Sequence, residues 1–106
     1  MPTVSEIFRS MPQRFDGEKA KELDLAVQFD LSGEQAGVWH AVIKDGAVDI
    51  GEGKLENPAA TIRMTGEDFV AMTTGELSAV NAFMMGKVKV EGDLNAVMTF
   101  QSIFGM

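Results

Sequence analysis

Few side chains in this 106-residue chain have the types and spacing that catalysis requires. His40 is the only histidine and there is no cysteine, so neither a pair of imidazoles nor a thiolate is available to hold zinc or attack a substrate. The alternation of the surrounding residues places His40 on the wet face of a strand. No serine occurs in a G-x-S-x-G motif. We therefore expect no catalytic residue, no metal site and no cofactor.

Glycines and basic residues also lack the arrangement of a phosphate site. Gly51-Glu52-Gly53 has neither the third glycine nor the strand-to-helix position of a dinucleotide-binding loop. Arg63, Lys87 and Lys89 are able to attract a phosphate or carboxylate group. Their positions on predicted strands favour a simpler interpretation, in which they cover an exposed sheet face.

Composition excludes several protein classes. Nine Lys and Arg residues against 16 Asp and Glu residues give a net charge of −7. This charge argues against a nucleic-acid partner, because such affinity depends on neutralising phosphates. No apolar run approaches the ~20 residues of a transmembrane helix, and no basic-then-apolar segment opens the chain as in a secretory signal. We expect one domain over residues 1–106, located in the cytoplasm and without stable membrane insertion.

The first element that the pattern predicts is an amphipathic helix. Thr3 and Glu6 have the spacing of a capping box at its start. Apolar residues follow at steps of three and four, which is one helical stripe. Pro12 is expected to end or kink this helix near Met11.

A period of two then begins and indicates strands. Residues 23–31 alternate between apolar and polar, as do residues 38–44 and the segment around 48–50. Asp45-Gly46 between the last two segments predicts a hairpin with a type I′ turn. These segments predict a three-stranded antiparallel meander with one apolar face.

The second half of the chain adds two strands and three helices. Strands are expected over 61–65 and 87–91, the latter with Val88 and Val90 pointing inward. Helices are expected over 66–74, 76–85 and 93–104. Thr65 and Asp68 have the spacing of a capping box at the start of the first of these helices. The fold class is therefore α+β, a five-stranded largely antiparallel sheet with helices packed on one face.

The predicted helices direct large apolar side chains toward the sheet. Methionine, with 8 residues, outnumbers leucine, with 6, and its flexible thioether suits a surface that repacks around varied ligands. A filled core stays as the alternative, because residue patterns do not distinguish it from a hollow one. We expect an apolar ligand to be lined by Trp39, Ile62, Met64, Phe69, Met72, Val80, Phe83, Met84, Met85, Val90, Met98, Phe100 and Phe104.

Several segments resemble the sterol carrier protein domain, also called the non-specific lipid-transfer or sterol-binding domain. Residues 82–93 read A-F-M-M-G-K-V-K-V-E-G-D and are similar to the family run A-F-x-x-G-K-x-K-x-x-G-D. The segments 39–46, 58–62 and 65–75 resemble further family segments in the same order. The resemblance extends over residues 4–104.

This resemblance implies a fold and a function. The fold is a five-stranded sheet covered on one side by helices, with a hydrophobic tunnel between sheet and helices. Members bind sterols, fatty acids, fatty acyl-CoA or phospholipids with low selectivity. Others are accessory domains of larger enzymes or help to handle isoprenoid quinone precursors in bacteria. Ala60 departs from the Asp that many members carry, and the chain ends in Phe-Gly-Met rather than a peroxisomal S-K-L tail. We therefore expect a stand-alone prokaryotic protein.

Three functions remain open from the sequence. The favoured one is non-catalytic binding or transfer of a lipid, such as a sterol, fatty acid or fatty acyl-CoA, in the tunnel. The alternative is an interaction or dimerisation module without ligand, or an accessory module of a lipid- or quinone-handling assembly, and a homodimer is left open. Ala26, Val38 and Val42 would give that module a small apolar patch on the wet face. An enzyme is least supported, because only His40 or an inward carboxylate would be available to act.

Overall fold

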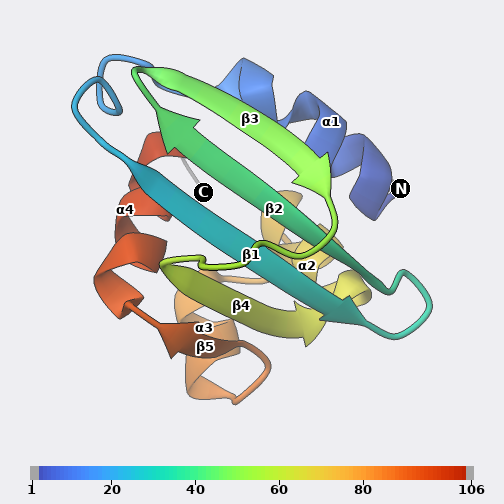
Figure 1. Cartoon of the computed structure of the whole chain (residues 1–106). Coiled ribbons are helices and arrows are strands. Elements are labelled where there is room, and N and C mark those ends of the chain that lie inside the picture. Colours follow the sequence, from blue (N-terminus) through green and yellow to red (C-terminus); the bar gives the residue numbers. More distant parts are fainter. Residues whose placement is uncertain (1–2, 105–106) are drawn as a thin grey trace.

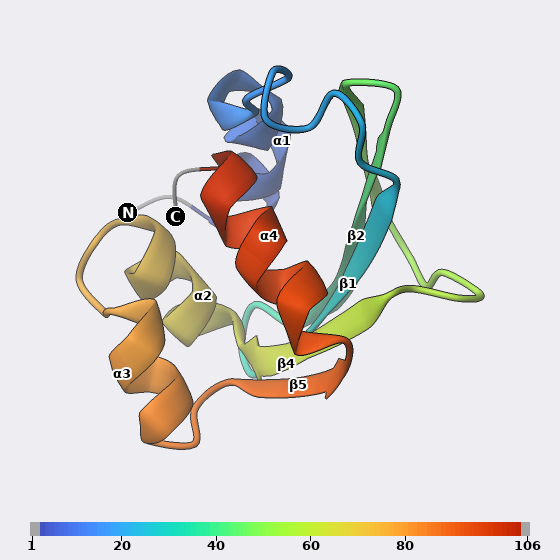
Figure 2. The ribbon, with the colours of Figure 1, turned by 90° about the vertical axis from the view of Figure 1, so that its left-hand side faces the viewer.

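The computed structural model describes residues 3–104 and confirms the α+β class. Five strands form one sheet, and four helices lie behind it (Figure 1). Seen from the side, the sheet and the helices form two layers (Figure 2). In chain order the elements are α1 (Val4–Arg14), β1 (Leu25–Ser32), β2 (Gly37–Lys44), β3 (Ala47–Glu52), β4 (Ala60–Thr65), α2 (Gly66–Thr73), α3 (Ala79–Met84), β5 (Lys89–Gly92) and α4 (Leu94–Phe104).

The sheet has the order β3-β2-β1-β4-β5 and contains one parallel pair. The predicted meander is present, since β1 pairs antiparallel with β2 and β2 with β3. Asp45 and Gly46 have φ values of 54° and 74°, as a type I′ turn requires. The chain then crosses the outer face of the sheet, and β4 adds to β1 in parallel (Figure 1). The Leu55 N–H donates to Gln28 Oε1 at 2.8 Å, which holds this crossing segment on the sheet.

Local hydrogen bonds explain where the helices begin and end. Thr3 and Thr65 accept the N–H groups of Glu6 and Asp68, which confirms both predicted N-caps. Of the two outcomes expected at Pro12, an end of the helix near Met11 is wrong, because α1 continues to Arg14 with Pro12 inside it. Proline removes its own backbone donor and crowds the carbonyl four residues earlier, but in the last turn few helical hydrogen bonds remain to be disturbed.

Two other elements start later than predicted, because local backbone hydrogen bonds hold the preceding residues in turns. β1 starts at Leu25, because the N–H of Leu23 donates to the Ala20 carbonyl at 3.0 Å in a turn. α3 starts at Ala79 rather than at residue 76, because the N–H of Leu77 still bonds the Ala71 carbonyl at 3.1 Å.

Aromatic rings fill the centre of the interface between sheet and helices. Phe8 of α1 is 0% exposed, and its ring stacks on Trp39 at 4.8 Å and on Phe69 at 4.9 Å between centroids. Phe29 meets Phe8 edge-on at 5.2 Å and contacts Phe100 of α4 at 5.4 Å. One cluster thus joins α1, β1, β2, α2 and α4 on the predicted inner face of the sheet.

On the outer face, an ion-pair group links three strands. Arg63 of β4 pairs with Asp30 of β1 at 2.6 Å and with Glu91 of β5 at 3.1 Å. The side-chain hydrogen bond with Arg63 and its positive charge lower the pKa of Glu91, and the same hydrogen bond raises the pKa of Arg63. The group ties the short edge strand β5 to the rest of the sheet.

We expect Phe8→Ala to destabilise the fold by about 3–5 kcal/mol, because it removes a buried ring and leaves a cavity among three others. Chemical denaturation measures this loss. Phe83→Ala is the matched control, because Phe83 is 49% exposed on α3 and should lose far less. Equal losses in the two variants would contradict the central role of Phe8.

Arg63→Ala should raise the pKa of Glu91 toward the ordinary value of about 4.3. A carboxylate whose pKa is lowered in the folded state stabilises the fold above its ordinary pKa, and this contribution disappears as pH falls through the lowered value. NMR titration of the glutamate side-chain carbons measures the shift, with Lys44→Ala as the control. An unchanged Glu91 pKa in Arg63→Ala would show that the ion pair does not form in solution.

Candidate functional site

The layer between sheet and helices is hollow beside β4 and β5. One cavity of about 290 Å³ lies between α2, the 75–79 segment and α4, with β4 as its floor. A second cavity of about 260 Å³ continues from it between α3, α4 and β5. Because five residues line both cavities, we treat them as one groove. The shared residues are Met72, Ala79, Val88, Val97 and Gln101.

The chain brings these elements together through very short connections. Thr65 ends β4 and is also the N-cap of α2, so α2 turns back at once over the strand that forms the floor. α4 follows β5 after one residue, Asp93, whose carboxylate accepts the Asn95 N–H at 2.9 Å. Both helices therefore lie over β1 and β4. The space left between them is the groove.

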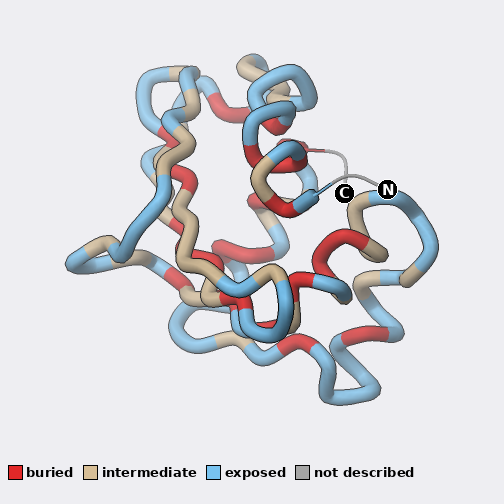
Figure 3. The backbone as a smooth tube through the Cα atoms, turned by 90° about the vertical axis from the view of Figure 1, so that its right-hand side faces the viewer, coloured by how far each residue is buried: buried red, intermediate tan, exposed pale blue. Residues whose placement is uncertain are grey.

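α3 closes the groove with few buried side chains of its own. It lies between Gly75 and Gly86, which have φ values of 84° and 76° and end the preceding helical turns. Only Ala82 of α3 is buried, whereas α4 buries five residues. In Figure 3, the tube of α3 is coloured mostly as exposed.

The groove lining is apolar and carries no charged side chain. Its hydroxyl groups are occupied locally, since Thr73 donates to the Val70 carbonyl at 3.0 Å and Ser78 accepts the Asn81 N–H at 3.5 Å. Gln101, half-buried on α4, is the remaining polar side chain of the lining among residues 3–104. Such a surface is suited to hold an apolar molecule and offers little to recognise a polar one.

Ten of the thirteen side chains expected to line a ligand face this groove. They divide between its two parts, and Met72 belongs to both. The first cavity is lined by Ile62, Met64, Phe69, Met72 and Phe100. The second is lined by Met72, Val80, Phe83, Met84, Val90 and Met98.

Trp39, Met85 and Phe104 line neither cavity. Trp39 points inward as expected, but it lies on β2, where Phe8 of α1 covers it. Phe104 is buried at the far end of α4 against Phe15, with 5.6 Å between ring centroids. Met85 follows the last turn of α3 and is exposed.

The sequence interpretation missed small and polar lining residues. It selected large apolar side chains, whereas a groove also needs positions where side chains are short. Phe29, Leu77, Val88, Leu94 and Val97 were readable from their apolar spacing, but the small and polar positions carry no such pattern. The additional lining residues are Phe29, Thr73, Gly75, Leu77, Ser78, Ala79, Val88, Leu94, Val97 and Gln101.

The side chain that was considered for catalysis lies away from the groove. His40 is on the outer face, where its Nδ1 lies 2.9 Å from the Gly53 carbonyl oxygen and its ring covers Gly51. Within residues 3–104, no group of three or more His, Asp or Glu side chains is arranged to hold a metal ion. In the same part of the chain, no helix has the length and apolarity to cross a bilayer.

Comparison with known proteins gives similarity over nearly the whole chain. Hydroxysteroid dehydrogenase-like protein 2 of Xenopus tropicalis is 32% identical over 103 residues, which is 96% of this chain and 25% of that protein. The chain thus spans about a quarter of the length of the curated relatives it matches.

Solved structures share the fold. Palmitated SCP2L2 from Aedes aegypti superposes with a TM-score of 0.80 at 19% identity, covering 99% of this chain and 96% of that one. The stereoselective inverting sec-alkylsulfatase Pisa1 from Pseudomonas sp. contains a similar region, with a TM-score of 0.83 at 18% identity, covering 97% of this chain and 16% of the sulfatase.

The likeness in fold and the match in sequence both extend over almost the full length of the chain. The sequence model of the SCP-2 sterol transfer family matches residues 5–105. The chain belongs to the SCP-2 sterol transfer family.

Proposed function

We propose that this protein binds apolar lipids in the groove between β4, β5, α2, α3 and α4, without catalysing a reaction on them. The observation that carries the proposal is the groove lining, which is continuous, apolar and free of charge over two joined cavities of about 290 and 260 Å³. A lipid chain loses water on entering such a groove, and the lining loses water with it. Both changes favour binding.

The proposed ligand class is broad. Large discrimination between ligands comes from buried polar groups that are left unpaired by the wrong ligand. Among the described lining residues, Gln101 is the polar side chain without a hydrogen bond to a neighbouring backbone group. A single amide forms too few hydrogen bonds to distinguish one headgroup from another. Fatty acids, sterols and acyl chains should therefore all bind, with affinities that follow their apolar area.

The methionines of the groove suit this role. Four different elements each contribute one methionine to the lining. They are Met64 of β4, Met72 of α2, Met84 of α3 and Met98 of α4. Their unbranched side chains change rotamer at low cost and so adapt to ligands of different shape. The SCP2L2 of Aedes aegypti, which shares the fold, is palmitated, and this supports a fatty acyl chain as one occupant.

The side chains around the groove also support binding without catalysis. The groove holds no acid, base or nucleophile next to the space where a ligand would lie. We further propose a cytoplasmic location, for which the sequence composition is the support. In larger relatives the domain occupies a quarter of the chain, so an accessory role beside an enzyme is a second candidate.

The outer face of the sheet favours this second candidate in one respect. Ala26, Val38 and Val42 lie there on adjacent strands and are only half-buried, as expected from the sequence. A partner domain or a second copy of the chain is able to cover them. The two functions are compatible, since this patch and the groove lie on opposite faces of the sheet.

We expect the purified protein to bind a fluorescent fatty acid, and unlabelled fatty acids, a sterol and an acyl-CoA all to displace it. The physical reason is the lining without polar recognition groups. Displacement titrations monitored by fluorescence measure the affinities. Strict preference for one hydrogen-bonding ligand would contradict the broad class, and no binding of any lipid would favour the accessory module.

Met72→Glu should lower fatty-acid affinity by roughly tenfold or more, because it places an unpaired carboxylate against the ligand in both cavities. Met72→Leu keeps the volume and apolarity of the side chain and is the matched control. Ala79→Phe should weaken binding by filling the same space. Circular dichroism checks that each variant is folded, and unchanged affinity of a folded Met72→Glu variant would place the ligand elsewhere.

A further inference from the structure

The methionines of this protein differ sharply in how far water reaches them. Met11 and Met64 are 1% and 7% exposed and belong to the core. Met84, Met85 and Met98 are 78%, 65% and 59% exposed. An oxidant in the surrounding water reaches the second group freely, whereas the packing around the first group keeps it out. The chain thus carries both protected and unprotected thioethers.

Two of the three unprotected methionines line the groove. Met84 of α3 and Met98 of α4 both line the second cavity. Met85 follows Met84 directly and is exposed to a similar degree, but it lines neither cavity. A chemical change at Met84 and Met98 therefore alters the surface that a lipid would contact, and the same change at Met85 alters only the outside of the protein.

The reaction of a thioether with a peroxide needs no other reactant. The O–O bond of the peroxide breaks, and one oxygen atom forms a bond to sulfur. Sulfur gives up two electrons, and the second oxygen of hydrogen peroxide leaves as water with both hydrogens. The product, methionine sulfoxide, is polar where the thioether was apolar.

The second cavity offers a sulfoxide few hydrogen-bond partners. Among the described residues that line it, Gln101 has the one polar side chain. One amide is too little for two sulfoxide oxygens, and a lipid chain has no donor. The oxygens of oxidised Met84 and Met98 would therefore either keep water in the groove or lie unpaired against the ligand. Both outcomes cost binding free energy.

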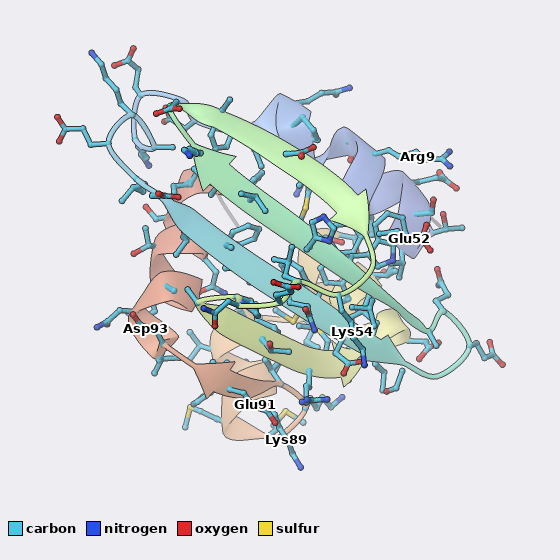
Figure 4. The ribbon with its side chains drawn as sticks, in the orientation of Figure 1. Arg9, Glu52, Lys54, Lys89, Glu91 and Asp93 are labelled. Atoms are coloured by element: carbon cyan, nitrogen blue, oxygen red, sulfur yellow. The ribbon has the colours of Figure 1, made fainter. Side chains whose placement is uncertain are left out.

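The charged side chains close to the groove in the sequence are directed elsewhere. Lys89 and Glu91 of β5 extend on the outer face of the sheet (Figure 4), where Glu91 pairs with Arg63 at 3.1 Å. Lys87 lies 3.9 Å from the carboxylate of Asp68. None of these side chains lines either cavity. They are therefore not placed to donate a hydrogen bond to a sulfoxide in the groove.

We propose that Met84 and Met98 form an oxidative modification site, at which a peroxide converts both thioethers to sulfoxides and lowers the affinity of the groove for lipid. The fold is retained, because the core methionines Met11 and Met64 are protected. The modification is reversible by methionine sulfoxide reductases, of which one type acts on each sulfoxide epimer. The inference rests on the proposed lipid binding and adds to it a control by oxidation.

Peptide mapping by mass spectrometry after graded hydrogen peroxide treatment tests the first step. Met84, Met85 and Met98 should be oxidised roughly tenfold faster than Met11 and Met64, because oxidation follows exposure. Equal rates at all five positions in the folded protein would overturn the proposal.

Binding of a fluorescent fatty acid tests the second step. The treatment is stopped when Met84 and Met98 are converted and the half-buried Met72 is still unmodified. The affinity should then be roughly tenfold lower, because polar oxygens replace part of an apolar lining. Circular dichroism should be unchanged, and incubation with reductases for both epimers should restore the affinity. A loss that accompanies unfolding would overturn the proposal.

Leucine variants assign the effect to residues. Leucine keeps the volume and apolarity of methionine and lacks the oxidisable sulfur. The double variant Met84→Leu/Met98→Leu should therefore keep its full fatty-acid affinity after the same peroxide treatment. Met85→Leu is the matched control, since it retains both groove methionines and should lose affinity as the wild type does. Equal loss in the double variant and the control would overturn the modification site.

The inference and the proposed function fail in different ways. No fatty-acid binding by the untreated protein would reject the proposed function, and the inference with it. Fatty-acid binding that is unchanged after full conversion of Met84 and Met98 would overturn the inference alone and leave the lipid site in place.

Discussion

The apolar face of the sheet has to be kept from water, and the other features of the molecule depend on how the helices achieve this. Alternate residues of β1, β2 and β4 point to one side and present Val27, Phe29, Leu31, Ala41, Ile43, Ile62 and Met64 there. α1 covers the centre through Phe8, and α4 covers β1 and β4 through Phe100. The contacts between these rings fix the two helices, because removing any one ring opens a void among the others.

Coverage is less complete toward β5, and this is where the groove lies. α2 has eight residues and α3 has six, and α3 buries a single alanine. Short helices between glycine stops do not reach far enough to fill the space above β4 and β5. Branched side chains would fix such a space in one shape, whereas methionine leaves it adaptable. The hollow is thus a consequence of element length and connection as much as of side-chain type.

The two faces and two ends of the molecule have different electrostatic character. The outer face of the sheet carries the Arg63 ion pairs, and the first 76 residues carry the net negative charge. The α3–α4 end is uncharged apart from residues 87–93, and it exposes methionine and phenylalanine. Net charge keeps the protein dispersed in water.

The sequence by itself determined the elements and the faces. Period-two alternation gave the strands and placed Trp39 and His40 on opposite faces of β2, because successive side chains of a strand point to opposite sides. Caps at Thr3 and Thr65 were readable from spacing, since each depends on residues three positions apart. An end of the helix at Pro12 was wrongly expected, because the cost of a proline depends on how much helix follows it.

Only the tertiary structure decided which apolar residues surround a space and which fill it. Phe100 and Phe104 occupy equivalent positions of one helical stripe, yet Phe100 lines the groove and Phe104 packs on Phe15. Met84 lines the groove and Met85 does not, although they are adjacent and of one type. The parallel pairing of β4 with β1 creates this difference, because it brings α2 and α4 over one floor. A hydrophobic pattern specifies burial toward a side, and a cavity is a property of how separate elements meet.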